Sequence, residues 1–116
     1  MVIKNSSKGD VICSDAKICK SILSKTVGLM FSKKPKPLIF ILKKEKIVPL
    51  HMFFVFFPID VLFLGKNRTV VEIKENFGPF SYYRPKNKAM YVIELPAGTI
   101  KKTKTEVGDK IKISDI

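Results

Sequence analysis

Two acidic residues lie within apolar stretches and are the first candidates for acid–base chemistry. Asp60 precedes the run Val61-Leu62-Phe63-Leu64, and Glu94 lies in the run Met90 to Leu95. Two carboxylates are the minimum equipment for acid–base catalysis, so a hydrolase that uses both is one candidate function. A carboxylate that accepts backbone hydrogen bonds near the Pro58 turn explains Asp60, and a structural salt bridge explains Glu94. We expect these structural roles and assign no catalytic residue.

Other groups that could bind a metal or act as a nucleophile are sparse. His51 is the only histidine, and the spacing of Cys13 and Cys19 fits neither a redox pair nor a zinc half-site. The sequence has no P-loop, Rossmann fingerprint or zinc signature. We therefore expect no metal, no cofactor, a hydrogen-bonded structural His51, and reduced cysteines buried in the core.

The segment from Tyr82 to Lys88 interleaves aromatic residues with cations. This composition is used to stack unpaired bases beside phosphates. The net charge of +12 adds nonspecific attraction to RNA, although the cations are lysines apart from Arg68 and Arg84. A basic RNA-binding protein is therefore an alternative function. The competing explanation of the same residues is that the tyrosines cover an edge of the core and the lysines only form a solvated surface. The candidate residues for nucleic acid are Tyr82, Tyr83, Arg84, Lys86 and Lys88.

The length and composition predict one globular domain over residues 1–116. The chain has 116 residues, 46% of them hydrophobic, which is sufficient for a core that needs no disulfide bond or structural metal. Its start is too polar for a secretory signal. The longest apolar stretch, residues 52 to 64, is shorter than the roughly 18 residues of a spanning helix. We expect a cytoplasmic monomer without membrane contact.

Apolar periodicity predicts short strands and one amphipathic helix. The helix runs from Cys19 to Phe31, where apolar residues recur every three or four positions. The strongest hairpin signal is Gly65 to Arg68, between two β-rich arms. A charged turn is expected at residues 43–46. The expected strands are 2–4, 10–13, 38–42, 52–57, 59–64, 69–73, 90–95 and 110–113. The fold class is mainly β, a sandwich or barrel with one short α-helix packed on it.

The order of these motifs resembles the uncharacterised archaeal and bacterial family called domain of unknown function 192, over about residues 9–112. The markers are the Gly28-Leu29-Met30-Phe31 box, the strand Leu38–Leu42, the block His51–Leu64, the segment Val92–Gly98 and the turn Gly108-Asp109. The resemblance implies a jelly-roll-like β-sandwich and no activity. The commoner bacterial pattern has a Trp-Met-Lys-Asn-Thr segment, and here His51-Met52-Phe53-Phe54-Val55 replaces its polar residues with apolar ones.

These observations favour a noncatalytic binding or accessory module, and an enzyme is not expected. Met and Phe side chains could line an apolar pocket, although core packing is the alternative use of the same residues. The cleft would lie between the helix end and the block from Met52 to Asp60. The partner would be a small ligand or a protein. The candidate ligand or structural residues are Gly28, Met30, Phe31, His51, Met52, Asp60, Glu94 and Gly98.

Overall fold

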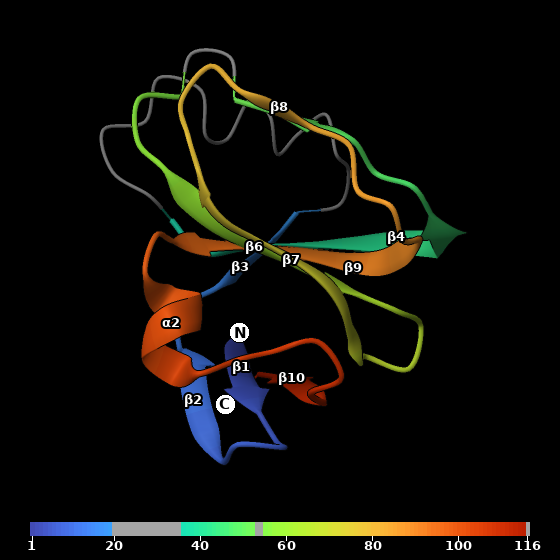
Figure 1. The fold of residues 1–116 in the computed structure, drawn as a ribbon. Helices are drawn as coiled ribbons and strands as arrows, with labels where there is room; N and C mark the ends of the chain where they lie inside the picture. Colours follow the sequence, from blue (N-terminus) through green and yellow to red (C-terminus); the bar gives the residue numbers. More distant parts are fainter. Residues whose placement is uncertain (20–35, 53–54, 116) are drawn as a thin grey trace.

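In the part of the chain that the structure describes, three β-sheets lie one above another (Figure 1). The computed structural model describes residues 1–19, 36–52 and 55–115. The central sheet has the order β3-β4-β9-β6-β7, formed by β3 (Lys17–Cys19), β4 (Leu38–Lys46), β9 (Ala89–Pro96), β6 (Ile59–Leu64) and β7 (Val70–Phe77). The sheet below it has the order β10-β1-β2, formed by β10 (Ile111–Ser114), β1 (Val2–Asn5) and β2 (Asp10–Cys13). Above it, β5 (Leu50–His51) pairs with β8 (Tyr82–Tyr83), and the helix α2 (Thr99–Thr103) lies beside the lower sheet.

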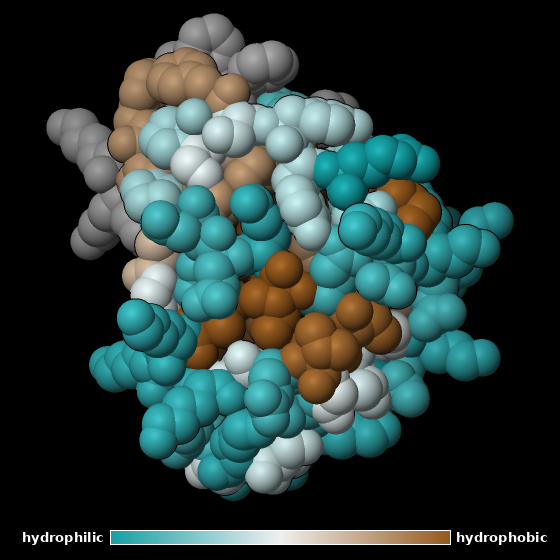
Figure 2. All heavy atoms as spheres, viewed as in Figure 1, coloured by the Kyte–Doolittle hydropathy of each residue, from teal (hydrophilic) through white to brown (hydrophobic). Residues whose placement is uncertain are grey.

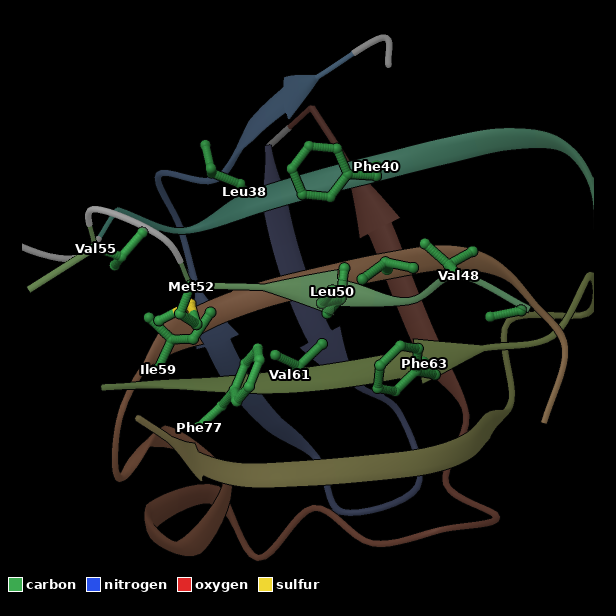
Figure 3. Close-up of a cluster of buried hydrophobic side chains, with 12 residues drawn as sticks. Leu38, Phe40, Val48, Leu50, Met52, Val55, Ile59, Val61, Phe63 and Phe77 are labelled. Atoms are coloured by element: carbon green, nitrogen blue, oxygen red, sulfur yellow. The ribbon is translucent and has the colours of Figure 1, made fainter. Parts of the chain in front are cut away.

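The central sheet is covered on both faces, which explains why β6 is buried at every position. Successive side chains of a strand point to opposite faces. Val61 and Phe63 therefore belong to an upper cluster, and Leu62 and Leu64 to a lower one. Figure 3 shows side chains of β4, β5, β6 and β7 pointing into one space, the upper cluster. Its buried members are Leu38, Phe40, Val48, Leu50, Met52, Val55, Ile59, Val61, Phe63, Phe77, Ala89 and Val92.

The lower cluster joins the central sheet to the three-stranded sheet and α2. It includes Ile3 of β1, Leu62 of β6, Ile100 of α2 and Ile111 of β10, all buried. Figure 2 shows hydrophobic side chains reaching the surface in a band between the two sheets, on a face that is otherwise mainly hydrophilic. The first and last strands are neighbours, because β1 pairs with β10 in antiparallel register. The two ends of the chain therefore close the same layer.

The mainly β fold with a short helix is confirmed. The predicted hairpin at Gly65 to Arg68 is also confirmed, since β6 and β7 are antiparallel and the Arg68 amide donates to the Gly65 carbonyl over 2.8 Å. Among the described residues no sheet closes into a barrel. The predicted helix over residues 19–31 lies outside the described residues from position 20 onward. In the described part of the chain, no helix is long and apolar enough to cross a membrane.

Two local predictions of secondary structure were wrong. The charged residues 43–46 continue β4 as a strand, which reaches a pairing of Lys46 with Ala89 in β9. Met52 and residues 55–57 belong to no strand, although residues 52–57 were expected to form one. The Val55 amide instead donates to the Met52 carbonyl over 3.2 Å. The side chains of Met52 and Val55 are both buried.

The cysteines differ in one respect from the expected pair of buried thiols. Cys13 and Cys19 are both free, but each is only half-buried. Burial raises the pKa of the Cys13 thiol, and the nearby Asp15 carboxylate raises it further. The thiolate is the reactive form, so this environment keeps Cys13 in its less reactive state.

Candidate functional site

Asp60 is buried in β6 and joins this strand to the end of β7 and to the start of α2. Its side chain is 1% exposed. Oδ1 accepts a hydrogen bond from the Asn76 amide over 2.9 Å, and Oδ2 accepts from the Gly98 and Ile100 amides over 3.0 Å each. The backbone acceptor role was expected, but the donors come from β7 and the start of α2, not from the Pro58 turn. Gly98 is the residue before the helix and has φ 93°. Because glycine has no side chain that could cap the first amides of the helix, the Asp60 carboxylate serves as the cap.

Glu94 lies on the opposite face of the sheet from Asp60. In the register of β6 with β9, Asp60 is opposite Leu95, and Glu94 is opposite Val61. Because facing residues in a ladder share a face, Glu94 lies on the side of the upper cluster, together with Val61, and Asp60 lies on the lower side. Glu94 is buried. The sheet therefore separates the two carboxylates, and they do not form an acid–base pair on one substrate.

The other candidate ligand residues do not gather into one described cleft. His51 is exposed and lies opposite Tyr82 in the β5–β8 pair. Met52 is buried in the upper cluster (Figure 3). Gly28, Met30 and Phe31 lie outside the described residues. Within the described ranges, no group of three His, Cys, Asp or Glu side chains is placed to hold a metal ion.

Glu72 organises the loop that follows β8, and the sequence analysis missed it. This β7 residue is 8% exposed. Its carboxylate accepts hydrogen bonds from the Tyr83 hydroxyl, from the Lys86 and Asn87 amides at 2.9 Å each, and from Asn87 Nδ2 at 3.0 Å. Burial acts to raise the pKa of Glu72, but these four hydrogen bonds outweigh burial and hold it below its ordinary value. The signal in the sequence was strand parity, because Glu72 is two residues from the buried Val70.

The two tyrosines of β8 point in opposite directions. The Tyr83 ring packs against Phe63 and Phe77, with centroids 6.0 and 6.2 Å apart, and Lys74 Nζ lies 5.4 Å from its centroid. Burial and the Glu72 carboxylate raise the pKa of Tyr83 to about 12. Tyr82 has the opposite parity and is 66% exposed. Of this pair, Tyr82 is therefore the ring that a partner can reach.

A pair of exposed phenylalanines lies beside β8. The rings of Phe56 and Phe80 meet edge to face with centroids 5.4 Å apart, and they are 59% and 54% exposed. Their segments are held together because the Phe80 amide donates to the Met52 carbonyl over 2.8 Å, and the Met52 amide donates to the Ser81 carbonyl over 2.8 Å. We call Phe56, Phe80 and Tyr82 the aromatic surface. The sequence analysis did not identify the two phenylalanines, although Phe80 follows the turn pair Gly78-Pro79.

Comparison with known proteins places this fold in a family. The family model of DUF192, whose description is "Uncharacterized ACR", matches residues 2–113. The chain belongs to the DUF192 family. The resemblance inferred from the motifs is thus confirmed, over a slightly longer stretch than expected.

The curated relatives of this DUF192 chain are UPF0127 proteins, and their names state no activity. A UPF0127 protein of Pyrococcus horikoshii is 39% identical over 113 residues, which cover 96% of this chain and 97% of that protein. A UPF0127 protein of Thermococcus sibiricus is 38% identical, covering 92% of this chain and 71% of that protein. A solved Novosphingobium aromaticivorans protein of unknown function has a TM-score of 0.82 and 20% identity, covering 97% of this chain and 82% of that one. A solved Sinorhizobium meliloti protein has a TM-score of 0.83 and 24% identity, covering 96% and 89%. At these identities the solved structures show the fold alone.

In this DUF192 chain, Phe80 keeps its ring exposed at a cost in backbone strain. Its φ is 59°, in the left-handed region that residues with a Cβ atom avoid. Phe80→Gly is therefore expected to be more stable than Phe80→Ala, with a free energy of unfolding about 1 kcal/mol higher. Both variants lose the ring, but only glycine relieves the strain. Urea unfolding of both variants measures the difference. At Tyr82, which lies in a strand, the glycine variant should instead have a lower free energy of unfolding than the alanine variant. Equal free energies of unfolding for Phe80→Gly and Phe80→Ala would contradict the backbone strain at Phe80.

Proposed function

We propose that this DUF192 protein is a noncatalytic binding module whose partner docks on the aromatic surface. The observation that carries the proposal is the ring pair of Phe56 and Phe80, which is more than half exposed on both sides of the contact. Large apolar side chains that gather on a surface are typical of interaction sites. Backbone strain such as that of Phe80 also concentrates at functional sites, where a stability cost is tolerated.

The buried carboxylates support a role without catalysis. The Asp60 carboxylate accepts hydrogen bonds from three backbone amides, and the Glu72 carboxylate accepts hydrogen bonds from four donors. At Asp109, burial acts to raise the pKa, but hydrogen bonds from Asn5, the Glu106 amide and Lys8 outweigh it and lower the pKa. A general base works best with a pKa near the operating pH, and low values oppose this use. The placement of Asp60 and Glu94 on opposite faces likewise disfavours the hydrolase.

The proposed surface replaces the cleft that the sequence suggested at the block from Met52 to Asp60. Met52, Val55 and Asp60 are buried, so they serve the core, and we propose that a partner contacts the outer side of the same block at Phe56. The sequence left a small ligand, a protein and RNA as partners, and planar groups that stack on aromatic rings occur in all three. We place this activity in the cytoplasm as part of the proposal, since two half-buried free thiols suit a reducing compartment.

The test maps where a planar probe binds. Indole is titrated into the isotope-labelled protein, and amide chemical shifts are followed by NMR. We expect the largest shifts at residues 80–83 and at Phe56. The double variant Phe56→Ser/Phe80→Ser should keep the dispersed spectrum of the fold and lose these shifts, because both rings are exposed and contribute little to the core. Shifts that centre elsewhere, or that persist in the double variant, would overturn the proposal.

A further inference from the structure

We infer that the outer side of residues 80–88 binds single-stranded nucleic acid, with bases on the aromatic surface and phosphates on the cations that follow it. This inference rests on the proposed function and names the partner. Tyr82 is the stacking residue, and Arg84, Lys86 and Lys88 are the phosphate contacts. All four side chains are exposed.

The exposed side chains of residues 80–88 change from aromatic to cationic along the sequence. Tyr82 and Arg84 are exposed, whereas Tyr83 is half-buried and Pro85 is buried, which is the alternation of an extended chain. At about 3.4 Å per residue, Tyr82 and Arg84 are about 7 Å apart, and the exposed Lys86 and Lys88 follow after a bend. The stripe therefore begins with rings at Phe80 and Tyr82 and continues with positive charge.

The inner side of the same segment is fixed, so the outer side is already ordered for binding. The Glu72 carboxylate holds the Tyr83 hydroxyl and the Lys86 and Asn87 amides. The pairing of β8 with β5 fixes the other end, where Tyr82 is opposite His51. A loop that is ordered before binding loses less conformational entropy when its partner arrives.

The charge along this stripe is complementary to phosphate. Residues 79–88 contain three cations and no Asp or Glu. The carboxylate that these residues contact, Glu72, is buried beneath them and accepts four hydrogen bonds, so it offers little repulsion to an outer ligand. The whole chain carries +12, which attracts any polyanion, so the local stripe must be tested against that background.

The rings favour a single strand over a duplex. An aromatic side chain stacks on the face of a base, and in a duplex these faces are covered by neighbouring bases. Tyr82 is 66% exposed and has an open ring to offer. Cations alone would bind both forms, so preference for the single strand separates stacking from simple attraction.

The first experiment measures the affinity and its stacking component. A fluorescein-labelled oligothymidylate of about 12 nucleotides is titrated with the full chain, and binding is followed by fluorescence anisotropy. Tyr82→Ala should bind about 10-fold more weakly, and Tyr82→Phe should match the unmodified protein within about 2-fold. A duplex of the same length should bind at least about 10-fold more weakly. No binding of the single strand near 0.05 M salt, equal binding of the duplex, or an unchanged Tyr82→Ala variant would overturn the inference.

The second experiment locates the phosphate contacts. Three contacts on a single strand predict that affinity falls about 20-fold between 0.05 and 0.2 M salt. Removing the cations of the stripe should abolish most of this dependence of affinity on salt. Removing three exposed lysines at the opposite end of the fold should leave the salt dependence unchanged (Figure 1). Both triple variants lower the net charge of +12 by the same amount. The two variants are Arg84→Ala/Lys86→Ala/Lys88→Ala and Lys101→Ala/Lys102→Ala/Lys112→Ala.

The outcomes separate this inference from the proposed function. Equal weakening by both triple variants would show attraction by net charge alone and overturn the inference. If indole shifts centre on the aromatic surface but the oligonucleotide does not bind, the binding module stands and its partner is not a nucleic acid. If neither probe reaches the aromatic surface, both proposals fail.

Discussion

Asp60→Asn is expected to lower the free energy of unfolding by about 3 kcal/mol. The carboxylate accepts hydrogen bonds from the Asn76, Gly98 and Ile100 amides and is almost fully buried. An asparagine side chain has one oxygen, so in either orientation its NH₂ group faces a backbone N–H that loses its acceptor. A buried donor without an acceptor costs more than the average hydrogen bond contributes.

Urea unfolding of the variant measures the effect, and Asp10→Asn is the matched control. Asp10 is exposed in β2, so the same chemical change there should alter stability by less than about 0.5 kcal/mol. Asp60→Ala should cost at least as much as Asp60→Asn. An unchanged or higher midpoint for Asp60→Asn would contradict the structural role, because carboxylates held for binding or catalysis often cost stability.

The elements that the sequence predicted well are those whose pattern is local. The β6–β7 hairpin has apolar arms around a polar turn with Gly65, and both arms and turn are adjacent in the chain. The strand at Lys110 to Ile113 alternates lysine with isoleucine, and the structure has a strand at 111–114 on the edge of the lower sheet. Period-two alternation reports a half-buried strand wherever one face meets a core.

The contacts of the candidate site depend on register between distant segments, which local pattern does not contain. Asp60 receives hydrogen bonds from residues 16, 38 and 40 positions away. The donors of Glu72 lie 11 to 15 positions away. Parity along one strand relates only the residues of that strand, and the pairing of β6 with β9 decided that Asp60 and Glu94 lie on opposite sides. A shift by one residue in that pairing would have reversed the result.

The aromatic surface escaped prediction because phenylalanine in an apolar run is usually a core residue. Phe56 lies in such a run, and its neighbour Val55 is buried as expected. The rings of Phe56 and Phe80 are exposed, and Phe80 has a left-handed backbone. This arrangement depends on hydrogen bonds between residues 52 and 80–81, and composition alone does not reveal it.

Glu72→Ala is expected to lower the free energy of unfolding by about 3 kcal/mol, because four donors lose one shared, charged acceptor. Glu72→Gln should cost only about 1 kcal/mol, since its amide oxygen can keep the Lys86 and Asn87 donors and its NH₂ group can donate to Tyr83. Hydrogen exchange at the Lys86 and Asn87 amides should accelerate most in Glu72→Ala. Glu75→Ala, an exposed change on the same strand, is the control, and an equal loss there would contradict the role of Glu72.

The stabilisation by the contact between Glu72 and Tyr83 is expected to decrease at both low and high pH. The pKa of Glu72 is lowered by folding, so its stabilisation is present above its unfolded value of about 4.3 and is lost as pH falls through the lower folded value. The stability difference between the unmodified protein and Glu72→Gln should therefore shrink below about pH 4, while the similar effect of Asp109 cancels because both proteins contain it.

At alkaline pH the same contact acts through the tyrosine. Folding raises the pKa of Tyr83 to about 12, so its stabilisation is complete below the unfolded value of about 10 and is lost as pH rises through the folded value. Phenolate absorbance of the folded protein should therefore show that the Tyr83 hydroxyl ionises late. In Glu72→Gln this group should ionise at lower pH, because burial still disfavours the phenolate but the neighbouring negative charge is gone. An unchanged late titration in that variant would mean that burial alone holds the proton, and that Glu72 does not fasten β8 through its charge.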